Sequence, residues 1–214
     1  MPEILRMSAF QTSGAPNIIA LVFACSFDGP PSTRYDATVN GAPDVWDALM
    51  RKIAGIAAAY LRVQVQAGAS AVQLFDSWAG ACTPEDYRRY VMPYSARVLA
   101  AAAELGVPRI HFGVNTGSLL PLMAEAGADV VGVDWRTPLS SAIPLVGERA
   151  VQGNLDPTLV FAPTDVMTAR AATIVEAGRA AHGHIFNLGH GVIPDTDPGQ
   201  LEALTRFVQS IPVS

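Results

Sequence analysis

The chain has 214 residues and is half apolar, which is enough for one large domain with a substantial core. Its formal net charge of −5 at pH 7 argues against a nucleic-acid or anionic-membrane partner. No apolar run is long enough to span a bilayer, and Cys25 and Cys82 form neither a disulfide framework nor a CxxC pair, so we expect a cytoplasmic protein.

The first third of the sequence predicts one strand and one long helix. Residues 1–14 have no clear period, residues 18–23 (IIALVF) are typical of a buried strand, and residues 25–41 are typical of a loop. A helix is predicted over residues 42–67, with Pro43 near its first turn and Gly68 at its end. Its expected apolar face consists of Trp46, Leu49, Ile53, Ile56, Ala57 and Tyr60.

Strands and helices alternate along the rest of the chain. Further strands are predicted over residues 71–75, 109–113, 130–134, 150–153 and 184–188. Helices are predicted over residues 83–105, with a break or kink at Pro93, over 118–126 and 164–181, and after Asp197. This alternation indicates parallel strands, and no strand is followed by a nucleotide-binding glycine motif. We therefore predict an α/β fold of the (β/α)8 TIM-barrel type, one domain over residues 1–214, with six of the eight strands present.

Polar residues follow five of the six predicted strands. They are Asp76 and Ser77, Asn115, Asp134 and Arg136, Asn154 and Asp156, and His190. In a parallel barrel these strand ends meet at one face, which is where ligands bind. We expect Asp134 and Asp156 to hold this face together by hydrogen bonds and not to act in catalysis.

Several of these residues have a structural alternative. Ser77 could cap the next helix, and His190 could be a turn histidine without a partner. His111, in the middle of a strand, is expected to point into the barrel as a satisfied core histidine, and His182 and His184 are expected to be solvated. The cysteines and histidines lack zinc-ligand spacing, so no metal is predicted.

Five segments taken together resemble the uroporphyrinogen decarboxylase family. They are VQLFDSWAG (72–80), VVGVDWRTPL (130–139), VQGNLDP (151–157), NLGHG (187–191) and PDTDP (194–198). The resemblance runs from about Asp44 to the C-terminus, and residues 1–43 match poorly. It implies a cytoplasmic carboxy-lyase of haem and porphyrin biosynthesis. Such an enzyme converts uroporphyrinogen III to coproporphyrinogen III by removing the carboxyl groups of the acetate side chains, without a cofactor. A homodimer is implied by the resemblance alone.

The resemblance also implies roles for two residues. Ser77 matches a serine that contacts the tetrapyrrole, and His190 matches a histidine at the substrate. In the family's reaction the pyrrole ring accepts a proton beside the acetate arm, becomes cationic and then loses carbon dioxide. Histidine exchanges protons near neutral pH, so His190 is the predicted proton donor. The glycines on either side are expected to let the backbone approach a ligand closely.

Two departures from the family pattern bear on activity. The family's N-terminal aspartate and two arginines have no counterpart, and Cys25 stands where the family has a tyrosine. We therefore expect a truncated or diverged chain with impaired turnover. Two other functions stay open. One is a cobalamin-type methyltransferase on the same barrel, which would need zinc ligands. The other is a non-catalytic remnant that binds tetrapyrrole or pairs with another chain.

Overall fold

The computed structural model describes residues 18–22 and 41–212, and within them six strands form one parallel sheet. The strands are β1 (Ile18–Val22), β2 (Ala71–Phe75), β3 (Arg109–Phe112), β4 (Val130–Gly132), β5 (Ala150–Gln152) and β6 (His184–Ile185). They pair in chain order, and all five neighbouring pairs are parallel. A doubly wound sheet reverses its strand order, whereas a (β/α)8 barrel keeps chain order throughout. The predicted α/β class and the count of six strands are confirmed.

The sheet is curved, because side chains from non-adjacent strands meet across one of its faces. The Gln152 side chain in β5 donates from Nε2 to Oε1 of Gln73 in β2 at 3.2 Å, and both are buried. In a flat sheet these strands would lie about 14 Å apart, at about 4.8 Å per strand. Ile110, Val130 and Ile185 form an apolar cluster from β3, β4 and β6. This concave face corresponds to a barrel interior.

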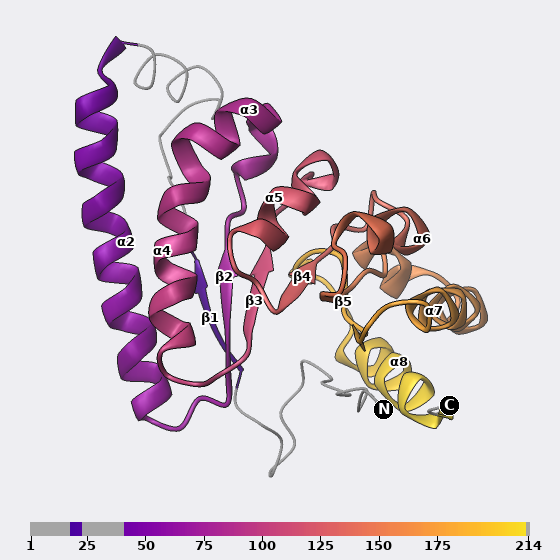
Figure 1. Cartoon of the computed structure of the whole chain (residues 1–214). Helices are drawn as coiled ribbons and strands as arrows, with labels where there is room; N and C mark the ends of the chain where they lie inside the picture. Colours follow the sequence, from indigo (N-terminus) through magenta and orange to yellow (C-terminus); the bar gives the residue numbers. More distant parts are fainter. Residues whose placement is uncertain (1–17, 23–40, 213–214) are drawn as a thin grey trace.

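The helices cover the opposite, convex face (Figure 1). They are α2 (Pro43–Gln66), α3 (Pro84–Asp86), α4 (Met92–Ala103), α5 (Leu120–Glu125), α6 (Leu139–Ala142), α7 (Thr164–Gly178) and α8 (Pro198–Ser210). Val72 and Leu74 of β2 pack with Leu61 of α2 and Leu99 of α4 in one cluster. A second, larger cluster joins outward-facing residues of β4 and β5 to α5, α6, α7 and α8. None of the described helices is both long and apolar enough to cross a membrane.

Helix α2 has the predicted extent, but its buried face is rotated from the predicted one. The buried side chains are Trp46, Met50, Ala54, Ala57, Leu61 and Gln64. Ile56 and Tyr60 are 62% and 51% exposed, so their assignment to the core was wrong. The helix carries apolar residues on two sides, and hydrophobicity alone does not tell which side meets the sheet.

The segment after β2 shows how the chain accommodates Pro93. Thr83 caps α3, because its Oγ1 accepts the Asp86 N–H at 3.1 Å. A five-residue π-helical turn, Tyr87–Val91, then leads into α4, where Pro93 occupies the first turn. The helix predicted over residues 83–105 is therefore broken before Pro93, as expected, and Pro93 lies in the first turn of α4, where proline needs no backbone donor. Gly106 follows the helix with φ +73°, as a C-terminal stop.

Two histidines differ from the sequence-based expectation. His111 is fully buried, but its register partner in β2 is Leu74, which packs against the helices, so the side chain points to the helix layer and not into the barrel. His184 was expected to be solvated, yet it is 8% exposed and bonds through Nε2 to the Gly153 carbonyl oxygen at 2.7 Å. Only His182 is exposed as predicted.

Candidate functional site

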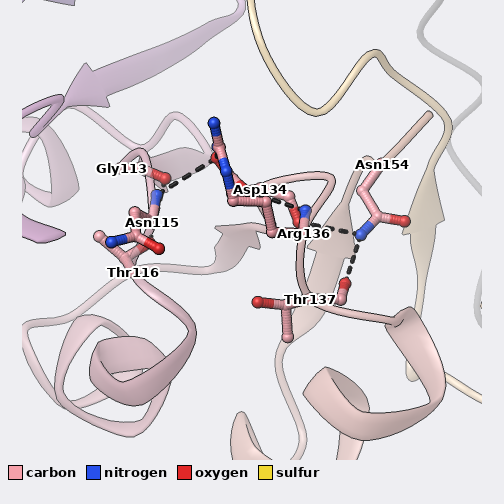
Figure 2. A network of polar contacts seen from close by, with 7 residues as sticks. All are labelled: Gly113, Asn115, Thr116, Asp134, Arg136, Thr137 and Asn154. Carbon is pink, nitrogen blue, oxygen red and sulfur yellow. Dashed lines mark hydrogen bonds and ion pairs between the residues drawn. The ribbon is translucent and has the colours of Figure 1, made fainter. Parts of the chain in front are cut away.

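The polar strand ends gather at the C-terminal edge of the sheet, and Asp134 is the residue that connects them (Figure 2). Its carboxylate is buried and accepts three hydrogen bonds. Oδ2 accepts the Asn115 N–H at 3.2 Å and Arg136 Nη1–H at 2.7 Å, and Oδ1 accepts the Arg136 N–H at 2.8 Å. Asp134 thus joins the loop after β3 to the loop after β4, which confirms the role predicted for it.

Asn154 extends this network to the end of β5. Its Nδ2 donates to the backbone carbonyl oxygens of Asp134 at 3.1 Å and Thr137 at 2.6 Å (Figure 2). Asn115 adopts φ +58°, in the left-handed region that asparagine tolerates better than most residues. The ends of β3, β4 and β5 are therefore held in one rigid arrangement. Asp156 contributes less than predicted, because it bonds only to Thr158 and caps the short helix Pro157–Phe161.

Two glycines bring the outer loops against this network. A Cβ atom at Gly80 would lie 2.2 Å from the Val114 carbonyl oxygen, so the loop after β2 touches the loop after β3. A Cβ atom at Gly189 would lie 2.3 Å from the Trp135 backbone nitrogen, so the loop after β6 touches the loop after β4. The close approach expected of Gly189 is therefore made to Trp135. Both contacts require the absence of a side chain.

Ser77 lies in the turn after β2, half-buried at this edge. The alternative role as a helix cap fails, because the following 3-10 helix Ala79–Ala81 begins after Trp78 and has no side-chain cap. Ser77 Oγ makes no hydrogen bond to any other described residue. The ligand contact predicted for this hydroxyl stays a prediction.

His190 lies beyond β6, directly after the Gly189 contact, and its side chain is exposed. Within the part of the chain that the structure describes, no hydrogen bond or ion pair joins His190 to Ser77. The two residues stand at the same edge of the sheet, each at the end of its own strand, on either side of the Asp134 network.

A buried polar cluster lies behind Ser77, on the helix side of β2. Asp76 accepts a hydrogen bond from Ser95 Oγ at 3.0 Å, and His111 Nε2 lies 3.4 Å from the same carboxylate oxygen. The His111 Nδ1 atom has no hydrogen-bond partner among the described residues. Burial, followed by the charge of Asp76, raises the pKa of the nearby Tyr87 hydroxyl far above its usual range. This cluster fixes the residue that precedes Ser77.

The sequence predicted Arg136 at a strand end but not its contact with the ring of Trp135. The Arg136 guanidinium carbon lies 4.4 Å from the centre of the Trp135 ring, a cation–π arrangement. The signal in the sequence was the adjacency of aromatic and arginine directly after a strand-end aspartate. No group of three or more metal-binding side chains occurs among the described residues.

The chain matches the family "Uroporphyrinogen decarboxylase (URO-D)" over residues 26–211. It is 72% identical over 203 residues to a protein of a Nocardioides species named uroporphyrinogen decarboxylase, which covers 94% of this chain and 58% of the relative. Proteins of the same name from Salinispora tropica and Thermobifida fusca are 58% and 54% identical, over 93% and 86% of this chain. The chain spans 53% and 52% of those two relatives.

Solved structures agree on the fold. A methyltransferase from Methanosarcina mazei superposes with a TM-score of 0.69 at 16% identity, over 91% of this chain and 58% of that one. A B12-independent methionine synthase from a Shewanella species gives a TM-score of 0.57 at 11% identity, over 74% and 55% of the two chains. Likeness at this level of identity concerns the fold alone. By its match over residues 26–211 and its high identity to three named relatives, the chain belongs to the uroporphyrinogen decarboxylase family.

Proposed function

We propose that this chain binds uroporphyrinogen at the C-terminal edge of its sheet and removes the carboxyl groups of the acetate side chains, giving coproporphyrinogen. The observation that carries the proposal is the joint placement of Ser77 and His190. Ser77 belongs to the segment 72–80 and His190 to the segment 187–191, and both segments reach this edge. The Ser77 side chain is half-buried and the His190 side chain is exposed. The Nocardioides relative at 72% identity carries the name of this activity.

The reaction requires a proton donor and an electron sink at the same place. In the proposed step, His190 gives a proton to the ring carbon next to the one that bears the acetate arm, which leaves a cationic ring conjugated to that arm. The bond between the methylene and the carboxylate then breaks, its electron pair enters the cationic ring, and carbon dioxide leaves. The methylene takes up a proton to become a methyl group, and the ring releases its extra proton. The net change consumes one proton and produces one carbon dioxide per arm.

Ser77 has a binding role in this scheme. Its hydroxyl can donate to a carboxylate or accept from a pyrrole N–H, and the buried Asp76 beside it fixes the turn. The other expectations belong to the same proposal: no cofactor, no metal, a cytoplasmic homodimer, and no nucleic-acid partner. The methyltransferase alternative would require stoichiometric zinc. Elemental analysis of protein purified without chelator therefore separates it from the decarboxylase.

The test follows binding and turnover separately, under anaerobic conditions that keep the porphyrinogen reduced. We expect uroporphyrinogen to bind the 214-residue chain and to yield products with fewer carboxyl groups together with carbon dioxide. His190→Ala should lower turnover by about a hundred-fold and leave binding nearly unchanged. Ser77→Ala should weaken binding by about ten-fold. His182→Ala, at an exposed histidine before β6, is the matched control.

The outcomes separate the parts of this proposal. A wild-type chain that neither binds nor decarboxylates uroporphyrinogen refutes the activity. Tight binding with no turnover favours the tetrapyrrole-binding remnant. Full activity in His190→Ala would remove His190 from the proton-donor role and leave the family assignment intact.

A further inference from the structure

The loops after β2 to β6, which the structure describes, contain a single cationic side chain at the C-terminal edge of the sheet. They comprise residues 76–83, 113–117, 133–138, 153–156 and 186–197, and among these described residues Arg136 is the only arginine or lysine. The same loops contain five aspartates, which are Asp76, Asp134, Asp156, Asp195 and Asp197. A site for a polycarboxylate needs a cation, and in this part of the chain only Arg136 can supply one.

The aspartates do not oppose this use of the site, because most of them are already engaged. Asp76 binds Ser95 on the helix side of the sheet, and Asp156 and Asp197 cap helices. Asp134 lies beneath Arg136 with its side chain 1% exposed, against 47% for the arginine. Asp76 and Asp134 are therefore buried, Asp195 and Asp197 are exposed in the loop after β6, and Arg136 is the exposed charge at the ends of β3, β4 and β5.

Arg136 is also held in a fixed position. Nη1 donates to Asp134 Oδ2 at 2.7 Å, the oxygen that also accepts the Asn115 N–H, so the guanidinium reaches from the end of β4 toward the loop after β3 (Figure 2). Its planar group stacks on Trp135, whose backbone abuts Gly189 next to His190. Only Nη1 is bonded to a described side chain, which leaves the donors on the other edge of the fork for a ligand.

We propose that Arg136 binds a carboxylate of the tetrapyrrole and is a residue that selects for polycarboxylate substrates. The guanidinium fork matches a carboxylate with two parallel hydrogen bonds, and a pre-positioned fork loses little entropy on binding. Asp134 and Trp135 act as positioning residues that aim the fork. The inference rests on the proposed function, since it takes the ligand to be uroporphyrinogen.

The experiment compares Arg136→Gln, Arg136→Lys and wild type by anaerobic titration with uroporphyrinogen, with product formation followed in the same samples. Arg136→Gln should weaken binding by about ten- to a hundred-fold. Arg136→Lys should fall between the two, because it keeps the charge but loses the fork. Where turnover is measurable, KM should rise and kcat should stay within about two-fold. Arg170→Gln, at an exposed position of α7, makes the same change in net charge.

Each outcome bears on one claim. If Arg136→Gln binds uroporphyrinogen as tightly as wild type, the inference is overturned and the proposed function stands. An equal loss in Arg170→Gln also overturns it, because net charge would then explain the effect. A wild-type chain with neither binding nor turnover refutes the proposed function and the inference with it. Circular dichroism and the thermal midpoint identify a misfolded variant, and Arg136→Lys then serves as the deciding comparison.

Discussion

Gly178 of α7 and His184 of β6 are packed so closely that a Cβ atom on the glycine would lie 2.0 Å from Nδ1 of the imidazole. The ring cannot turn aside at low cost, because Nε2 is bonded to the Gly153 carbonyl oxygen at 2.7 Å and the residue is buried. Helix α7 therefore approaches the last strand at a distance that only glycine permits.

Gly178→Ala should destabilise the protein. The alanine gains about 1 kcal/mol of helix propensity, but forcing an atom into a filled space costs about 1–3 kcal/mol, and here the displaced group also loses a hydrogen bond. We expect a net loss of about 1–2 kcal/mol in the free energy of unfolding, measured by urea denaturation. Gly55→Ala in α2, where nothing lies within 4 Å of the new atom, should stabilise by about 0.5–1 kcal/mol. A stabilising Gly178→Ala would contradict this packing.

The burial of His184 predicts a dependence of stability on pH. Burial lowers the pKa of His184 from its usual 6.5, against a smaller opposing effect of the bond to Gly153. The unfolded chain therefore takes up a proton at this residue before the folded chain does. The stability that the neutral ring contributes is present above about pH 6.5, is lost as the pH falls below it, and stops changing below the folded pKa.

The measurement is the urea midpoint of wild type and His184→Gln between pH 7.5 and 5. Glutamine keeps an amide donor for Gly153 and does not titrate in this range. We expect a slope of up to about 1.4 kcal/mol per pH unit in the wild type that is absent from the variant. His182→Gln, at an exposed site, should keep the wild-type slope. Parallel pH profiles for wild type and His184→Gln would disprove this origin.

The capping bond of Thr83 predicts a smaller effect at the start of α3. Its Oγ1 accepts the Asp86 N–H and donates to the Asp86 carboxylate at 2.8 Å. Thr83→Ala should lower the free energy of unfolding by about 1 kcal/mol, whereas Thr83→Ser keeps the oxygen and should cost only a few tenths. The measurement is the thermal midpoint of wild type and of both variants. Equal midpoints for wild type and Thr83→Ala would show that the cap does not stabilise the fold.

The sequence predicted the order and type of most elements, because apolar runs and helix stops such as Gly68 and Gly106 are local signals. Which side of a helix faces the sheet depends on tertiary contacts and not on the local sequence. For this reason Ile56 and Tyr60 were wrongly predicted to be buried. The short helix α6 was missed, since four residues give no period to detect. The alternation of side chains along β3 does not by itself tell which face of the sheet His111 is on. That face follows from the pairing of His111 with Leu74 in β2, which the sequence does not show.

For the strand ends, pattern alone predicted that the polar residues converge, because parallel strands share a C-terminal edge. It did not predict which of them bond. Asp134 proved to be the centre through three donors, whereas Asp156 serves only its own turn. The contacts at Gly80 and Gly189 depend on distances between loops that lie far apart in the sequence, and a single sequence carries no signal for them.

The buried pair of Ser95 and Asp76 gives the last prediction, which concerns both stability and the site. Ser95 is fully buried, and its hydroxyl donates at 3.0 Å to a carboxylate that is itself 5% exposed. Ser95→Ala would remove this donor and leave Asp76 with the His111 contact at 3.4 Å and the nearby Tyr87 hydroxyl, so we expect a loss of about 1.5–3 kcal/mol in the free energy of unfolding. Ser118→Ala, at an exposed position, should change it by less than about 0.5 kcal/mol.

A double-mutant cycle with Asp76→Asn isolates the bond from other consequences of each change. Because asparagine cannot carry the charge, Ser95→Ala in that background should cost about half as much. Asp76 directly precedes Ser77, so the loss of its bond to Ser95 should also disturb the position of Ser77. We therefore expect Ser95→Ala to bind uroporphyrinogen more weakly than wild type, measured at a temperature where the variant is fully folded. Additive stability effects would show that the hydroxyl and the carboxylate do not interact. Unchanged binding in a destabilised Ser95→Ala would show that the cluster supports the fold and not the position of Ser77.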